Sequence, residues 1–165
     1  MNNRGFTLIE LLSVIAIVMA LACIGMWDVK TWRDKAQIES ATKDLYGDLQ
    51  DARMRAAFTR RPQGVTLGVN AAGKSRAVFR RYSSESAGGV VTETKNYPFL
   101  FQENATGEIR FNTRGVMSGA ITKVICATPN VGAAHDALLV EQTITNLGKW
   151  TNRGAGCASA NVHKK

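Results

Sequence analysis

The chain has 165 residues, of which 45% are hydrophobic and 21% charged, so it has room for one domain and is neither a large multidomain enzyme nor wholly disordered. Its formal charge of +8 is compatible with polyanionic partners but selects none. Apolar residues are unevenly distributed, because residues 6–27 carry Glu10 as their only formal charge. This N-terminal segment is therefore the most informative part of the sequence.

Residues 6–27 form an apolar segment long enough to cross a membrane as one helix. A bilayer core about 30 Å thick needs roughly 20 apolar residues in helical conformation. A secretory signal peptide has a shorter apolar core, followed by small residues at its cleavage site. Residues 20–22 read Ala-Leu-Ala, so signal cleavage at this point remains the alternative to a retained membrane helix.

A polar leader, residues 1–5, precedes the apolar segment, and residues 5–10 read Gly-Phe-Thr-Leu-Ile-Glu. This junction resembles, at all six positions, the class III leader of type IV pilins and type II secretion pseudopilins. The resemblance implies that a prepilin peptidase cuts between Gly5 and Phe6 and methylates the new amine of Phe6. It also implies that residues 6–27 stay, first as an anchor in the cell inner membrane and then as the core of a periplasmic or extracellular filament.

Glu10 is the one formal charge within the apolar segment. A carboxylate in such a helix is costly and is usually paired or functional. After leader cleavage the nearest cation is the α-amino group of Phe6, and staggered helices could bring one subunit's amine to the next subunit's Glu10. That pairing would set the axial register of the filament. A carboxylate that snorkels to the headgroups remains the alternative for the unassembled subunit.

The helical pattern continues beyond the membrane segment as an amphipathic arm, residues 28–61. Its apolar residues follow spacings of three and four: Ile38, Ala41, Leu45, Leu49, Ala52 and Ala56. The Arg60-Arg61-Pro62 sequence is expected to end the helix. A helix over residues 6–59 is about 80 Å long, which suits a rod that lies half in lipid and half on a sheet.

Residues 62–165 are predicted to form a β-rich globular head. Short β-like runs alternate here with Gly, Asn and Ser, and the short links favour antiparallel pairing. The predicted strands are residues 65–69, 76–82, 90–94, 99–101, 109–111, 120–128, 138–145 and 149–152. Turns are expected at 70–73 and 146–148, and the tail from Gly154 is expected to be ordered only where something ties it down. The fold class is therefore α+β, a long N-terminal helix packed on a small antiparallel sheet, as in pilins.

A second resemblance concerns the head. Residues 109–116, with Phe111 and Gly115 in a Phe-x-x-x-Gly turn, and the late strand at 144–150 are similar to the GspH/FimT branch of the pilin superfamily. This implies a structural minor pilin or pseudopilin near the filament tip, with other pilin subunits and prepilin peptidase as partners. The proline common in the helix of major pilins is absent, which favours a minor subunit. The Gly-Arg-x-Arg motif of DNA-binding minor pilins is replaced by Gly-Lys-Trp-Thr at 148–151.

The three cysteines divide by environment. Cys23 lies in the apolar helix and is interpreted as a small buried hydrophobic residue. Cys126 and Cys157 lie in the head, which the pilin resemblance places outside the cytoplasm, where disulfides persist. A bond between them would tie the tail to a central strand, and two free thiols are the alternative.

No constellation of catalytic or cofactor-binding residues emerges from the sequence. The spacing of Cys126, His135, Cys157 and His163 resembles no zinc module, and neither histidine has an identifiable catalytic partner. The glycines form no phosphate-binding fingerprint. We therefore expect no enzyme, no metal, no cofactor and no small-molecule substrate.

Basic residues outnumber acidic ones by two to one beyond Pro62. Candidate DNA-binding residues are Arg76, Arg80 and Arg81 on one predicted strand, and Lys149, Arg153, Lys164 and Lys165 near the C-terminus. Tyr82 and Trp150 adjoin these clusters, a combination suited to phosphate contacts with base stacking. The alternative function is thus a DNA-binding minor pilin acting in DNA uptake during natural transformation, and the simpler interpretation is a solvated basic face without a ligand.

Overall fold

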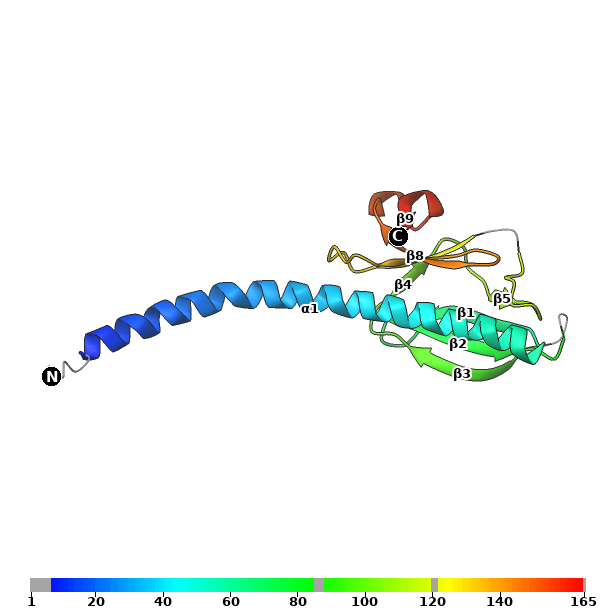
Figure 1. The fold of residues 1–165 in the computed structure, drawn as a ribbon, viewed down its shortest axis with the longest axis horizontal. Coiled ribbons are helices and arrows are strands. Elements are labelled where there is room, and N and C mark those ends of the chain that lie inside the picture. The colour runs from blue at the N-terminus through cyan, green and yellow to red at the C-terminus, as the bar shows by residue number, and fades with distance from the viewer. Residues whose placement is uncertain (1–6, 85–87, 120–121, 165) are drawn as a thin grey trace.

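The protein is an extended helix with a β-rich head on its C-terminal half (Figure 1). The structure, a computed structural model, describes residues 7–84, 88–119 and 122–164, without the side chains of residues 23–28. The predicted α+β fold, a long helix packed on antiparallel sheets, is confirmed.

Helix α1 runs over Leu8–Thr59, a length of 52 residues and about 80 Å. The predicted helix at 6–59 is confirmed from Leu8 onward, whereas Phe6 lies outside the described residues. Arg60 follows the helix in a left-handed conformation with φ of 51°, and Pro62 comes two residues later. These two residues end the helix where the sequence predicted.

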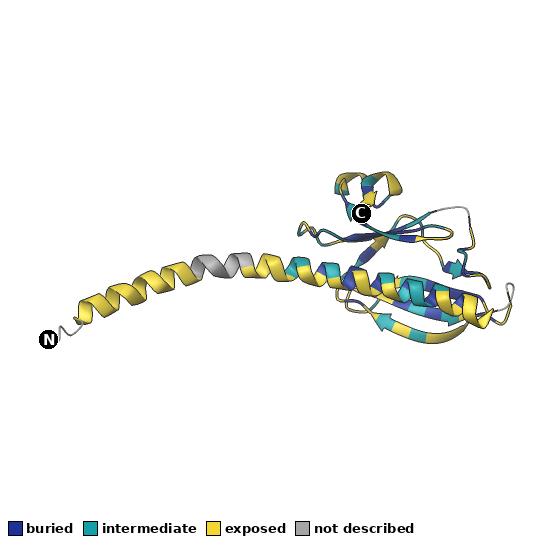
Figure 2. Cartoon of the chain, in the orientation of Figure 1, coloured by how far each residue is buried: buried dark blue, intermediate teal, exposed yellow. Residues whose placement is uncertain are grey.

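The two halves of α1 have opposite surroundings (Figure 2). The predicted apolar stripe of the C-terminal half is buried, with exposed fractions of 0–5%. The described part of the N-terminal half exposes large apolar side chains on all sides of the helix. They are Leu8, Ile9, Leu11, Leu12, Val14, Ile15, Ile17, Val18, Met19 and Leu21. The stripe is thus a packing surface for the head, and the N-terminal half is left without cover in the isolated chain.

The first sheet lies against α1 and has the strand order β3-β2-β1-β5, with all neighbours antiparallel. Its strands are β1 (Gln63–Val69), β2 (Ser75–Arg81), β3 (Val90–Asn96) and β5 (Ile109–Phe111). The predicted β1–β2 turn is present, because Asn70 Oδ1 accepts hydrogen bonds from the backbone N–H groups of Ala72 and Lys74.

The second sheet has the strand order β4-β6-β7-β8-β9 and is also antiparallel. Its strands are β4 (Phe101–Glu103), β6 (Lys123–Ala127), β7 (Ala137–Val140), β8 (Thr145–Trp150) and β9 (Val162–Lys164). Two short 3-10 helices, Arg153–Ala155 and Ser159–Asn161, connect the last two strands.

Three sequence predictions for this sheet were wrong. The predicted strand at 138–145 is split by a turn closed by the bond from Glu141 N to Ile144 O. The predicted turn at 146–148 lies inside β8, where a Cβ on Gly148 would stand 2.5 Å from Cγ1 of Val162. Gly148 therefore serves close strand packing and not a turn. The strand predicted at 99–101 begins at Phe101, since the backbone oxygen of Phe99 instead accepts from Ser75 N.

Polar side chains of α1 also bind the head at three levels. Glu39 Oε1 accepts a 2.7 Å hydrogen bond from the backbone N–H of Ala134. Asp48 Oδ2 accepts one of 2.7 Å from the Tyr97 hydroxyl, and burial together with this bond raises the pKa of the Tyr97 phenol. Arg53 donates to backbone oxygens in the turn between β7 and β8. Helix and head are therefore joined by directional bonds as well as by the apolar core.

Candidate functional site

The N-terminal half of α1 is the first candidate site, because its exposed apolar residues need a covering partner. Exposed fractions reach 81% at Leu8 and are still 46% at Ile15, the most covered of these large side chains. In the part of the chain that the structure describes, no helix meets the length and apolarity needed to cross a membrane. The predicted cleavage and methylation positions, Gly5 and Phe6, lie outside the described residues.

Glu10 forms a capping box with Thr7 at the start of α1. Its Oε2 accepts hydrogen bonds from the backbone N of Thr7 at 2.9 Å and from the Thr7 hydroxyl at 2.8 Å, and its own backbone N donates to Thr7 Oγ1 at 3.4 Å. Sequence reasoning missed this local role, although Thr-x-x-Glu before an apolar run is its signature. In the isolated chain the carboxylate therefore has partners within its own helix.

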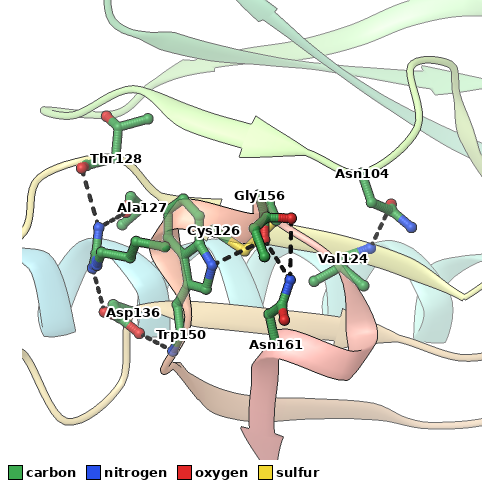
Figure 3. The surroundings of a disulfide bond; sticks show 12 residues. Asn104, Val124, Cys126, Ala127, Thr128, Asp136, Trp150, Gly156 and Asn161 are labelled. Atoms are coloured by element: carbon green, nitrogen blue, oxygen red, sulfur yellow. Dashed lines mark hydrogen bonds and ion pairs between the residues drawn. A yellow bond between two sulfur atoms is a disulfide. The ribbon is translucent and has the colours of Figure 1, made fainter.

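The head contains a disulfide between Cys126 on β6 and Cys157 in the tail (Figure 3). Both residues are buried in a second small core, where Trp150 Nε1 donates a 3.2 Å hydrogen bond to the backbone oxygen of Gly156. Closing a loop of this length contributes roughly 3–4 kcal/mol in the chain-entropy model. The disulfide thus attaches to the second sheet a tail that the sequence left loosely defined.

Arg153 lies beside this cluster and makes internal contacts through both terminal nitrogens of its guanidinium group. Its Nη2 lies 2.5 Å from Oδ2 of Asp136, a residue only 1% exposed, and its Nη1 donates to the backbone oxygens of Ala127 and Thr128. The guanidinium carbon also lies 4.6 Å from the centre of the Trp150 ring. The terminal N–H groups of Arg153 that would contact a DNA phosphate are therefore already bonded within the chain.

The other candidate DNA-binding residues near the C-terminus differ in availability. Lys164 Nζ is paired with Glu141 Oε1 at 2.5 Å, whereas Lys149 is half-buried and Lys165 lies outside the described residues. The expected stacking role of Trp150 was wrong, because the ring is buried beneath Arg153. This region therefore offers fewer free charges than its sequence indicates.

The candidate residues on β2 lie in the other sheet. Arg76 and Arg81 are exposed, whereas Arg80 donates a 2.8 Å hydrogen bond to Thr66 Oγ1. Tyr82 is buried and covered by the Arg110 guanidinium, 3.7 Å from its ring centre, so the expected base stacking on Tyr82 was wrong too. The structure does not merge the two predicted basic clusters into one site, since one lies on β2 and the other on β8 and β9.

A metal site is not evident either. Within the described ranges, His, Cys, Asp and Glu side chains form no group of three or more that could hold a metal ion.

Comparison with known proteins decides the class of the N-terminal segment. Residues 1–25 match the prokaryotic N-terminal methylation motif. Neither the curated proteins nor the solved structures contain a match to the chain.

The motif supports a type IV pilin-type subunit, made as a prepilin, processed by prepilin peptidase and assembled with other pilins. The same motif indicates a precursor anchored in the inner membrane. The segment it covers runs from the leader into the exposed apolar half of α1, so motif and geometry concern the same part of the molecule.

Proposed function

We propose that the chain is a minor pilin or pseudopilin, a structural and non-catalytic subunit near the tip of a type IV pilus or type II secretion filament. One observation carries the proposal: the methylation motif leads directly into a helix whose first half exposes its apolar side chains and whose second half carries a β-rich head. A subunit of this form can be anchored, extracted and packed through one continuous helix.

The exposed apolar half of α1 is consistent with residues 6–27 being covered first by lipid and later by neighbouring subunits. Burying one large apolar side chain contributes about 1.5–3 kcal/mol, so the apolar surface from Leu8 to Leu21 strongly favours a covered state. Lipid covers this surface in the inner-membrane precursor, and the helices of other subunits cover it in the filament. In the filament, Glu10 pairs with the Phe6 amine of a neighbouring subunit and sets the register.

Leader processing tests this function. Intact-mass measurement of the purified protein is expected to show loss of residues 1–5 and one added methyl group on Phe6. Gly5→Leu is expected to leave the full precursor in the membrane, because the peptidase must accommodate the residue before the cut. Gly47→Leu is the matched control, since an added Cβ at Gly47 meets no neighbouring atom within 4 Å. A mature chain that begins just after Ala22 would instead establish ordinary signal-peptide cleavage and overturn the proposal.

DNA capture is the second candidate function. The observation that favours it is that the side chains of Arg76 and Arg81 are both exposed on β2 and have no hydrogen bond or ion pair with another described residue. Phosphates bound there would release counterions and make the affinity strongly salt-dependent.

A duplex-DNA titration tests this second candidate. The double variant Arg76→Ala and Arg81→Ala is expected to weaken binding by about 1–2 kcal/mol and to flatten the salt slope by roughly two, one for each lost phosphate contact. Arg55→Ala is the control, because Arg55 is paired with Asp51 at 2.6 Å on the helix surface. Absence of any mobility shift for the wild-type protein at low salt leaves only the structural role.

A further inference from the structure

Helix α1 ends beside the turn that follows β5, at the end of the molecule farthest from the N-terminus (Figure 1). A cleft lies there, with lining residues from both segments. It has a volume of about 480 Å³ and is lined by Ala57, Arg60, Thr113 and Arg114. We call it the distal cleft. None of its lining residues belongs to the apolar segment or to the basic clusters predicted from the sequence.

Two local structures hold the walls of the distal cleft in place. Asn112 Oδ1 accepts hydrogen bonds from the backbone N–H groups of Arg114 and Val116, which fixes the turn after β5. At Gly115, where φ is +74°, a Cβ would stand 3.1 Å from the backbone oxygen of Arg53, so the turn abuts the helix closely. Thr113 and Arg114 are therefore presented beside the helix terminus by a constrained backbone.

Arg60 forms the opposite wall and has an unusual backbone. It is the one non-glycine residue with positive φ in the described part of the chain. A left-handed conformation costs a long side chain of the order of 1 kcal/mol, and such strain occurs often at ligand sites. Arg60 thus occupies a position for which glycine would be the residue of lower energy.

The charge of the distal cleft is positive and uncompensated. The side chains of Arg60, Arg114 and the adjacent Arg61 are exposed, and none of these guanidinium groups has a hydrogen bond or ion pair with another described residue. Among the residues that the structure describes, no carboxylate lines the cleft. The C-terminus of α1 contributes about half a negative charge, which the guanidinium groups outweigh.

We propose that the distal cleft binds a phosphate group. Each guanidinium is a planar fork that fits two oxygens of one anion. A phosphate carries more negative charge and more free oxygens than a carboxylate, so it is better suited to a site where Arg60, Arg114 and the Thr113 hydroxyl can all donate to one anion. The volume leaves room for a substituent on the phosphate. Because the cleft is complete in one chain, this site does not depend on filament assembly.

The test is calorimetric titration of the full chain in a maltoside detergent, which carries no phosphate. Inorganic phosphate and a thymidine dinucleotide are the probes, and acetate is the anion control. Both Arg60→Gly and Arg114→Ala are expected to weaken phosphate binding about tenfold, since each removes a charge-assisted fork. Arg60→Gly keeps the left-handed backbone and so preserves the fold. Arg60→Lys and Arg114→Lys retain the charge and are expected to weaken binding less.

Arg55→Ala is the matched control, because Arg55 lies on helix α1 outside the cleft lining and is paired with Asp51 at 2.6 Å. It is expected to leave phosphate affinity unchanged within twofold. The two probes distinguish the source of the phosphate: tighter binding of the dinucleotide supports a diester backbone, and tighter binding of inorganic phosphate supports a free or terminal phosphate. Absence of saturable phosphate binding, equal binding of acetate, or an equal loss in Arg55→Ala overturns the proposal without affecting the pilin assignment.

Discussion

Asp136→Ala is expected to lower the free energy of unfolding by about 3–5 kcal/mol, because it removes a buried carboxylate and leaves the guanidinium of Arg153, which is only 18% exposed, without its partner charge. The same carboxylate accepts a 2.6 Å hydrogen bond from the backbone N of Trp150, which would also lose its partner. Urea denaturation of the disulfide-bonded chain, followed by circular dichroism, measures the change.

Glu141→Ala is the matched control for this experiment. Glu141 pairs with Lys164 at the same 2.5 Å separation, but the Lys164 side chain is 53% exposed. Exposed pairs contribute about 0–1 kcal/mol, so the control should change stability little. A double variant, Asp136→Leu with Arg153→Met, is expected to recover much of the loss, because it removes both charges together. A loss below about 1 kcal/mol in Asp136→Ala would contradict the assigned role of this ion pair.

The long helix could be predicted because two independent patterns define it. An apolar run covers its first half, and the stripe from Ile38 to Ala56 repeats at helical spacing over its second half. The C-terminal end of the helix could be predicted as well, since Arg60-Arg61-Pro62 cannot continue a helix without strain or lost hydrogen bonds. Local sequence signals were enough to predict the helix, because an α-helix forms its backbone hydrogen bonds within its own segment.

Strand limits in the second sheet were harder to predict, because they depend on partners distant in sequence. β9 is a strand only because Val162 and its neighbours pair with β8, and the disulfide at Cys157 holds this tail nearby. Gly148 was interpreted as a turn residue, although its actual constraint is contact with Val162 on the neighbouring strand. Neither contact leaves a signal in a window of ten residues.

The availability of basic side chains was also hard to predict, because it depends on contacts between distant parts of the chain. The sequence offered Arg153 and Arg76 equally as DNA-binding candidates. In the structure, Arg153 is bound to buried Asp136, whereas Arg76 is exposed. Arg60 and Arg114, 54 positions apart in the sequence, were not singled out as a site, but the fold places both on one cleft. Which basic residues are free to bind a ligand is therefore a property of the tertiary structure, and composition alone gives only their number.

The bonds between α1 and the head bear on assembly. Glu39, Asp48 and Arg53 attach successive levels of the helix to the head. A contact that fixes the axial position of the N-terminal half therefore also fixes the position of the head. Under the proposed function, this coupling would let a single carboxylate at Glu10 position the whole subunit in a filament.

Glu10→Ala is expected to insert into the membrane normally but to reduce recovery in sheared filaments at least about tenfold, because the variant has no carboxylate to pair with the Phe6 amine of a neighbouring subunit. The comparison of filament and membrane fractions by immunoblot measures this. Ser13→Ala is the control, since Ser13 lies one turn further along the same exposed helix and its hydroxyl bonds only the backbone oxygen of Glu10.

Glu10→Gln separates the two roles of this side chain. Glutamine can replace glutamate in a capping box with Thr7, but it carries no charge to attract a neighbouring Phe6 amine. If Glu10 sets the register by charge, Glu10→Gln should be as defective in filament incorporation as Glu10→Ala, with an unchanged helix content. Near wild-type recovery of Glu10→Gln, with a defect confined to Glu10→Ala, would show that capping of α1 is the essential role. Recovery of both variants at the wild-type level would remove Glu10 from the assembly mechanism altogether, because neither its charge nor its hydrogen bonds would then be required.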